Sequence, residues 1–524
     1  MPGVIGPWRT AVASLAIVGT AATLTSRAQS PQPTSSVRPA FALPFSVTLG
    51  DPFSVDGVDE GLHSYVFGTI GDRVLIVGGR RAGLHGFSSD ENPTNFGSEN
   101  GFMWVIDLAA RKAFKRFVTP AEPFLLGDVL SATNQQAAQD GDDLFVVGGY
   151  GLDSPSRRNK TFPSLTIINL PRAMDLVTNG DPNSPMLSAI TRPPDDERFR
   201  VTGGALFQVN HRFFLLFGQV FDGMYTPAPK VTASFTQVYT ESVRSFTYGG
   251  TPPAVTWLPS FPVAPALNHD MYHRRDFSAV LTLDASGADR LSVFGGAFRM
   301  GRPEAHLNVV DIDGLGDPMP MITVPPLTAR TLSAPSPQPG ASPAPAPPLA
   351  PHVQPNPNAF QQGLSQYSCP TVTIVGGAAA GDAFTIFFGG LSQFRYDAPL
   401  LQLIENEAMT DHGLDTVGFI DAISGVATRK DQTRQGFIIR AKMPGLMGTS
   451  AALIPRPGFE NGRVDLGKLT APTTVGYIFG GITATALHAG AAGTSASPLF
   501  IPVIVTPTAS SADPMPLIPL LLPR

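Results

Sequence analysis

One short pattern decides the fold: an apolar run that ends in two glycines, first met as VLIVGG at residues 74–79. Five further copies follow it, namely LFVVGG at 144–149, FFLLFGQ at 213–219, LSVFGG at 291–296, FTIFFGG at 384–390 and VGYIFGG at 475–481. The first glycines of the six copies stand at positions 78, 148, 218, 295, 389 and 480. A motif that recurs across nearly the whole chain indicates one repeat architecture.

Each run is rich in β-branched and aromatic residues and predicts a buried strand, often after a turn such as Gly141-Asp142. Strand candidates flank the runs at 63–69, 134–138, 203–209, 276–283, 367–375 and 448–453 upstream, and at 103–108, 165–170, 236–248, 307–312, 400–404 and 499–505 downstream. The glycine pair is expected where another backbone comes close, because glycine has no Cβ to clash. In the third copy, Gln219 is expected to replace the second glycine.

Four-stranded units that repeat around an axis are the blades of a β-propeller. The units resemble kelch repeats in the apolar run, the glycine pair and the later strand that ends in Asp-Leu, as at 103–108. They depart from that family because the tyrosine and tryptophan behind the glycine pair are mostly missing, with Trp104 near such a place. The resemblance spans about residues 60–505 and implies an all-β, six-bladed kelch-like propeller.

The sixth unit ends at its third strand, near Val505, whereas a spare strand candidate at 45–49 precedes the first unit. A blade of three strands would expose unpaired backbone groups at a joint of the ring. We therefore expect the N-terminal strand to close the last blade.

Composition sets the limits of the function. The chain has 524 residues with 53 glycines and 52 prolines, and 15% of its residues are charged, which argues against long helices. Its formal net charge of −5 argues against a nucleic-acid partner. The single cysteine, Cys369, excludes an intrachain disulfide framework and a metal site made of several cysteines.

The ends of the chain point to export. Residues 1–28 have the charged start, apolar stretch and small-residue cleavage site of a signal peptide, followed by a flexible leader at 29–40. The propeller is expected at 41–505, with a Pro/Ala-rich insertion at 331–358 and a Pro-rich tail at 506–524. The alternative to cleavage is an N-terminal membrane anchor, but the apolar stretch at 11–24 is short for the roughly 20 residues of a spanning helix, and no apolar run elsewhere reaches about 18 residues. We expect a secreted or periplasmic monomer without a transmembrane segment in its mature form.

The long loops after the glycine pairs share one face of the ring with the loops that enter the next blades, so this loop face is where a site is expected. The residues expected to bind a ligand there are Arg81, Arg158, Tyr225, Arg274, Arg275, Arg302 and Arg395. Arginine can hold a carboxylate or a pair of sugar hydroxyls, and His273 and Glu304 are the candidates for moving a proton. A structural alternative is that the polar run 269–276 ties neighbouring blades together.

No metal site and no cofactor are expected, and the motifs of common hydrolases and phosphate-binding loops are absent. Two functions remain. The first is a binding module that recognises a protein or glycan partner through its loop face. The second is a sugar-active enzyme, similar to an epimerase or mutarotase, in which the arginines surround a central pocket. Convergence of Arg81, Arg158, Arg275, Arg302 and Arg395 on one pocket would favour the enzyme.

Overall fold

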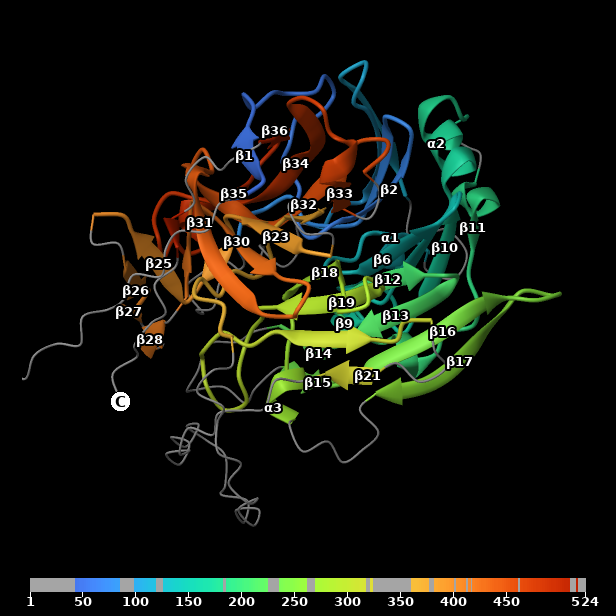
Figure 1. Cartoon of the computed structure of the whole chain (residues 1–524). Coiled ribbons are helices and arrows are strands. Elements are labelled where there is room, and N and C mark those ends of the chain that lie inside the picture. The colour runs from blue at the N-terminus through green and yellow to red at the C-terminus, as the bar shows by residue number, and fades with distance from the viewer. Residues whose placement is uncertain are drawn as a thin grey trace, which may run out of the picture. The chain divides into compact units, whose positions relative to one another are not determined.

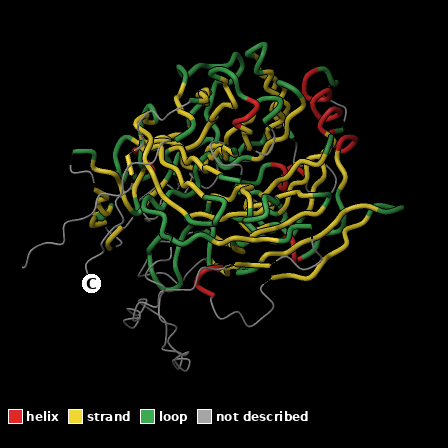
Figure 2. The backbone as a smooth tube through the Cα atoms, viewed as in Figure 1, coloured by secondary structure: helices red, strands yellow, loops and turns green. Residues whose placement is uncertain are grey.

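A computed structural model of the chain describes residues 43–84, 99–118, 126–181, 185–224, 235–261, 269–316, 321–323, 360–376, 381–399, 402–410, 413–415, 417–459, 462–508 and 515–516. Strands dominate these residues, and helix is confined to a few short segments (Figure 2). The strands form six sheets in a ring, so the chain is a six-bladed β-propeller, as the repeated runs predicted (Figure 1). The expected leader and Pro/Ala-rich insertion lie outside the described residues.

Each blade has four antiparallel strands in its main order. Blade 1 contains β2 (Val66–Ile70), β3 (Arg73–Val77), β4 (Phe102–Asp107) and β5 (Lys112–Phe117); blade 2 contains β6 (Gln136–Asp140), β7 (Asp143–Val147), β10 (Leu165–Asn169) and β11 (Ile190–Thr191); blade 3 contains β12 (Ala205–Val209), β13 (Arg212–Leu216), β16 (Val243–Gly249) and β17 (Ala254–Phe261). The runs before the glycine pairs supply the second strand of every one of these blades, as expected.

The second half of the ring follows the same order with some additions. Blade 4 contains β18 (Ser278–Leu283), β19 (Asp289–Phe294), β20 (Val310–Asp313) and β21 (Met321–Thr323); blade 5 contains β22 (Thr371–Val375), β23 (Ala383–Phe388), β30 (Ala422–Thr428) and β31 (Arg434–Lys442); blade 6 contains β32 (Leu446–Pro455), β34 (Thr473–Ala484), β36 (Phe500–Pro507) and β1 (Phe45–Leu49). Short strands extend blades 5 and 6: β33 (Arg463–Asp465) pairs with β22, β37 (Met515–Pro516) with β31, and β35 (Thr494–Ala496) with β34.

The third strand of blade 5 differs from the sequence-based expectation. Residues 400–404 were expected to form it, but Gln402–Glu405 is β26, which pairs with β25 (Phe394–Asp397) in a separate hairpin. The blade strand is β30, further along the chain, which pairs with β23 over six residue pairs. The expectation was wrong because the loop after the fifth glycine pair contains strands of its own.

The N-terminal strand closes the ring, as predicted. β1 pairs antiparallel with β36 from Phe45↔Pro507 to Leu49↔Val503, and the two lie side by side in blue and red in Figure 1. Phe45 is completely buried and meets Phe384 of blade 5 edge to face, with ring centroids 5.2 Å apart. The closing strand therefore completes blade 6 and also packs against the neighbouring blade.

The glycine pairs are the joints between blades. A Cβ on the first glycine would lie only 2.1 Å from the Val201 carbonyl oxygen at Gly148, and 2.0 Å from that of Met447 at Gly389. The second glycine donates its N–H to the same carbonyl, at 2.8 Å from Gly149 to Val201. Both glycines of each pair also have positive φ, so the position requires glycine for its conformation as well as for its space.

The third copy fits this scheme only after a shift by one residue. Gly218 donates to the Arg274 carbonyl at 2.9 Å, as a second glycine does, and Phe217 takes the first position with φ 42°. Gln219 then corresponds to Tyr150, since the bridges Thr202↔Gln219 and Thr133↔Tyr150 are equivalent. The expectation that Gln219 replaces the second glycine was wrong; Phe217 replaces the first.

A ring of backbone hydrogen bonds surrounds the axis. The residue that enters each blade has φ between 51° and 65°, and the six are Ser64, Asn134, Gly203, Asp276, Ser368 and Ser450. In five of these residues the N–H donates, over 2.5–3.2 Å, to the carbonyl of the equivalent residue one blade earlier. These bonds connect the blades around the mouth of the central channel.

The core is divided into apolar layers between neighbouring blades. Leu144 and Val146 of β7 pack in the layer shared with blade 1, whereas Phe145 and Val147 pack in the layer shared with blade 3. This alternation is the period of two expected for a strand that is covered on both faces. Every blade contributes to two such layers, which explains why the repeated runs are apolar throughout.

In the described residues, three short α-helices lie in the loops: α1 (Leu126–Leu130), α2 (Leu170–Thr178) and α3 (His269–Tyr272). α2 starts directly after β10, where the Asn169 side chain accepts a hydrogen bond from the Arg172 N–H at 3.3 Å and Pro171 occupies the first turn. Its apolar face packs on the layer between blades 1 and 2. None of the helices in the described part of the chain is long and apolar enough to cross a membrane.

Candidate functional site

The loop face is built from hairpins that follow the glycine pairs. β8 (Tyr150–Asp153) pairs with β9 (Arg158–Thr161) after blade 2's pair, and β14 (Gln219–Gly223) pairs with β15 (Phe235–Tyr239) after blade 3's pair. In blade 5, β24 (Leu391–Ser392) pairs with β29 (Gly418–Phe419), and β27 (Ala408–Thr410) pairs with β28 (Gly413–Asp415). These hairpins add residues after the glycine pairs, which makes the repeated units of this chain longer than those of shorter repeats.

The hairpins of blades 2 and 3 and the loop of blade 4 are joined to one another. The Thr161 hydroxyl donates to the Phe221 carbonyl at 2.7 Å, and its backbone N–H donates to Asp222 at 3.1 Å. The Tyr239 hydroxyl accepts from the Phe298 N–H at 3.4 Å, which connects β15 to the loop of blade 4. Hydrogen bonds therefore connect the loops of blades 2, 3 and 4 to one another on this face.

The expected ligand-binding arginines are distributed over this face rather than gathered at one place. Arg81 lies 3.4 Å from Glu60, and Arg302 lies 3.7 Å from Glu304. Arg158 and Arg395 are exposed at the starts of β9 and β25. Tyr225, the remaining member of the expected set beside the 274–275 pair, lies outside the described residues.

Arg274 and Arg275 have different surroundings although they are adjacent. Arg274 is completely buried; its Nε donates to the Met271 carbonyl at 2.6 Å and its Nη1 to the Gly295 carbonyl at 3.0 Å. Burial lowers the pKa of Arg274 to about 9. Arg275 instead pairs with the Asp276 carboxylate beside the channel mouth. The Arg274 side chain thus joins α3 to the glycine pair of blade 4, while the Arg274 carbonyl accepts from Gly218 of blade 3, so it is the backbone of this polar run that links the two blades.

His273 and Glu304 both contact polar side chains of opposite kind, a carboxylate for His273 and arginines for Glu304. The Nδ1 of His273 is 2.7 Å from Glu241 Oε1, and its ring stacks on Tyr239 with centroids 3.6 Å apart. Glu304 lies 3.3 Å from Arg299, which also contacts Asp270 at 2.9 Å. Contacts with neighbouring side chains therefore hold both candidates for proton transfer, His273 and Glu304, in place.

A small cavity lies at the mouth of the central channel. It has a volume of about 100 Å³ and is lined by residues such as Arg80, Tyr150, Gln219 and Arg275. Of the expected ligand-binding residues that the structure describes, Arg275 alone lines it. Pockets for small ligands have volumes of about 300–1,000 Å³, so this cavity has room for part of a ligand rather than for a whole sugar.

At the mouth of the channel, polar groups of two blades that are not neighbours are connected by a hydrogen bond. The Asn134 side chain donates to Asp276 Oδ1 at 3.3 Å, which links blades 2 and 4. Gly203 of blade 3 lies between them, and a Cβ there would be 2.8 Å from the same carboxylate oxygen. Glycine at this position leaves the space through which the Asp276 carboxylate reaches blade 2.

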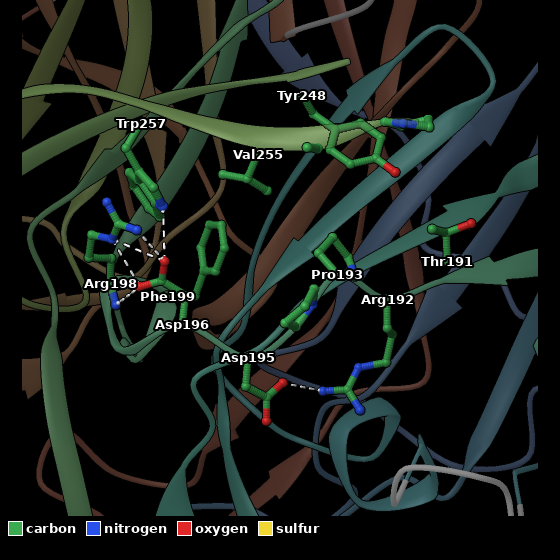
Figure 3. A pocket seen from close by; sticks show the side chains of 13 residues that line it. Thr191, Arg192, Pro193, Asp195, Asp196, Arg198, Phe199, Tyr248, Val255 and Trp257 are labelled. Carbon is green, nitrogen blue, oxygen red and sulfur yellow. Dashed lines mark hydrogen bonds and ion pairs between the residues drawn. The ribbon is translucent and has the colours of Figure 1, made fainter. Parts of the chain in front are cut away.

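A larger groove lies beside the ring, between the outer parts of blades 2 and 3 (Figure 3). Its volume is about 470 Å³, within the range of ligand pockets. One wall comes from β16 and β17, with Tyr248, Val255 and Trp257; the other comes from the segment 191–199 that leads into blade 3. The sequence did not indicate this groove.

One end of the groove is fixed by a compact cluster. Arg198 Nη2 lies 2.5 Å from Asp196 Oδ2, and the Trp257 indole N–H donates to the same oxygen at 3.1 Å. The guanidinium of Arg198 also lies over the Trp257 ring, 4.5 Å from its centroid. The hydrogen bond from Arg198 lowers the pKa of Asp196. The carboxylate therefore remains ionised and holds both side chains in place.

The sequence carried only weak signals for this groove. RPPDDERF at 192–199 combines two prolines with a run of charges, which is also the composition of an ordinary surface turn, and Trp257 is one of three tryptophans. The contact between segment 192–199 and β17 depends on how blades 2 and 3 pack against each other. Local pattern alone could not place the two beside each other.

The thiol of Cys369 and the possible metal ligands are further groups that could carry chemistry. The Cys369 thiol lies 3.6 Å from the Ser278 hydroxyl, and burial raises its pKa to about 12, so it is not a reactive thiolate at neutral pH. Within the same residues, no three His, Cys, Asp or Glu side chains come together in a way that could hold a metal ion.

No family model matches the chain, and no curated protein matches its sequence. Among solved structures, the one described as "Structure of YjhT" has a TM-score of 0.42 and 12% sequence identity, with 84% of this chain and 94% of that chain covered.

Proposed function

We propose that the protein is a binding module that recognises a protein partner through the hairpins of blades 2 and 3 and the adjoining loop of blade 4 on its loop face. The observation that carries the proposal is the position of its exposed apolar side chains. Five large hydrophobic residues are exposed in the described chain, and four of them, Leu152, Met224, Val238 and Met300, belong to these adjoining loops. The fifth, Phe117, ends the outer strand of blade 1.

Exposed apolar groups gathered among arginines are typical of protein interfaces, in which methionine and arginine are enriched. Arg158 at the start of β9 and Arg302 in the blade 4 loop supply the charges beside these side chains. The predicted arginines do not gather in one pocket, and the cavity at the channel mouth holds about 100 Å³. This arrangement favours recognition by a surface over catalysis in a closed pocket.

Val238 offers a direct test, because its side chain is 62% exposed in the middle of β15. Val238→Glu is expected to weaken binding of the partner by at least about tenfold, or about 1.4 kcal/mol, because a charge would be buried at the interface. A partner captured from the secreted fraction would be titrated against the wild type and the variant by surface plasmon resonance.

Thr256→Glu on the exposed part of β17 is the matched control, since it adds the same charge to a strand away from the loop face. Its affinity for the partner is expected to equal that of the wild type. Equal loss in both variants, or no loss in Val238→Glu, contradicts the proposed surface.

The kelch resemblance and the export of the chain belong to the same proposal. The six glycine joints support the first, and the pattern of residues 1–28 supports the second. The exported protein is then expected to start near Gln29, which sequencing of its N-terminus would check. A protein that keeps residues 1–28 after fractionation, or that stays in the cytoplasm, contradicts export.

A further inference from the structure

We propose that the groove between blades 2 and 3 is a binding site for a neutral oligosaccharide. The site lies beside the ring and uses none of the loop residues of the proposed protein-binding face. The proposal therefore adds a second ligand to the molecule and stands or falls separately from the first.

The size and walls of the groove suit sugar rings. Its volume of about 470 Å³ is enough for a ligand larger than a single sugar, within the usual range of pockets. The walls include the rings of Pro193 and Tyr248 together with Val255, which Figure 3 shows, and Pro194 also lines the groove. Apolar faces of this kind can pack against the C–H faces of pyranose rings, and this burial is favourable at about 25 cal/mol per Å².

The charges of the groove favour a neutral ligand. The lining contains two arginines and two aspartates, and these are paired with each other at both ends, as Figure 3 shows. Arg192 Nη2 lies 2.7 Å from Asp195 Oδ1, and Arg198 pairs with Asp196 at the opposite end. A charged ligand would find no excess of opposite charge, whereas hydroxyl groups can donate to the carboxylates and accept from the guanidinium groups.

Asp195 is the more accessible of the two carboxylates, because its side chain is 54% exposed, against 26% for Asp196, while one oxygen is bonded to Arg192. Hydrogen bonds to charged groups contribute more than those between neutral groups, so one or two sugar hydroxyls on this carboxylate would give the site its selectivity. Figure 3 shows Asp195 and Arg192 on the same side of the groove as Pro193.

The opposite end is organised before any ligand arrives. Asp196 accepts hydrogen bonds from Trp257 and from both Nε and Nη2 of Arg198. Arg244, which is buried and has its pKa lowered to about 10 by that burial, donates to the Arg198 carbonyl at 2.5 Å. A site held in one conformation loses less entropy on binding than a mobile one.

The same cluster argues against a proline-rich peptide. Such peptides dock between exposed aromatic faces. Here the Arg198 guanidinium already lies over the Trp257 ring, and Phe199 lies 4.7 Å from the same ring. Tyr248 and the prolines remain as flat surfaces, which is sufficient for sugar rings but leaves no aromatic slot for a polyproline helix.

The test uses the full chain and isothermal titration calorimetry with a panel of neutral disaccharides to tetrasaccharides of glucose, galactose, mannose and N-acetylglucosamine. At least one is expected to bind with a Kd below about 1 mM, equivalent to about −4.1 kcal/mol. Val255→Trp fills the groove and is expected to weaken that binding by at least about tenfold. Asp195→Asn, an exposed change that keeps the shape of the site, is expected to weaken it by about threefold or more.

Thr256→Trp is the matched control, because Thr256 is exposed, follows Val255 on β17 and lies on the opposite face of the strand. It is expected to bind like the wild type. Three results would overturn the proposal: no binding by any neutral member of the panel at about 10 mM, equal affinity in Asp195→Asn and wild type, or stronger binding of 3′-sialyllactose or decaproline than of every neutral sugar.

Discussion

Deleting residues 41–50 is expected to abolish the single cooperative unfolding transition of the propeller. The deletion removes β1, in which Phe45 and Val47 are buried between blades 5 and 6, together with the buried Leu43 before it. Each such side chain contributes about 1.5–3 kcal/mol by its burial, so their sum approaches the whole stability of an ordinary domain. The deletion also exposes the edge of β36. Urea unfolding followed by tryptophan fluorescence would measure the loss.

Point variants distinguish the stability that comes from side-chain packing of β1 from the stability that comes from having the strand at all. Phe45→Ala leaves the strand in place but empties a buried site, and it is expected to cost about 3–5 kcal/mol. Thr48→Ala, at the exposed position of the same strand, should change the free energy of unfolding by less than about 0.5 kcal/mol. An unchanged transition in the deletion variant would mean that blade 6 does not need its fourth strand.

The second large effect is expected from Asp311, a carboxylate buried between blades 4 and 5. Its oxygens lie 2.7 and 2.8 Å from Arg434 Nη2, and the Ser292 hydroxyl donates to it at 2.7 Å. Both partners of the ion pair are less than about a tenth exposed. Asp311→Ala leaves the arginine charge buried without this carboxylate and is expected to lower the free energy of unfolding by about 3–5 kcal/mol. Chemical denaturation at neutral pH would measure the change.

Two other variants serve as comparisons for Asp311→Ala. The double variant Asp311→Leu, Arg434→Met removes both charges and should recover much of the stability, because a buried ion pair is often replaceable by apolar packing. Lys442→Ala breaks the exposed pair with Asp421, at 2.8 Å, and should cost at most about 1 kcal/mol. A loss in Asp311→Ala no greater than that in Lys442→Ala would show that the joint between these blades does not depend on this pair.

The fold could be predicted because its main determinant is local and repeated. Each apolar run has the composition of a doubly covered strand, and each glycine pair marks a place where the next blade approaches. The closing strand was also predictable, since a three-stranded last unit and a spare N-terminal strand complement each other. The third glycine pair was misaligned because Phe217 adopts a positive φ that composition does not reveal.

The sites were less predictable because they depend on contacts between blades. The sequence marked the run 269–276 as a polar cluster, yet it could not show that Arg274 is buried in a joint while Arg275 reaches the channel mouth. The same limit applies to the groove. Asp196 and Trp257 are 61 residues apart, and their hydrogen bond exists only because blade 3 stacks on the segment that follows blade 2.

The strand that closes the ring also sets the order in which the molecule can be completed. Phe45 pairs with Pro507, so the first strand of the propeller has to remain without its partner until the last blade has been synthesised. Blades 1 to 5 can pack on one another as they emerge, but the final contact has very large sequence separation, a property associated with slow folding. During that interval the apolar side of β1 is open to chaperones and to other chains, and any truncation before β36 leaves the chain permanently in this state.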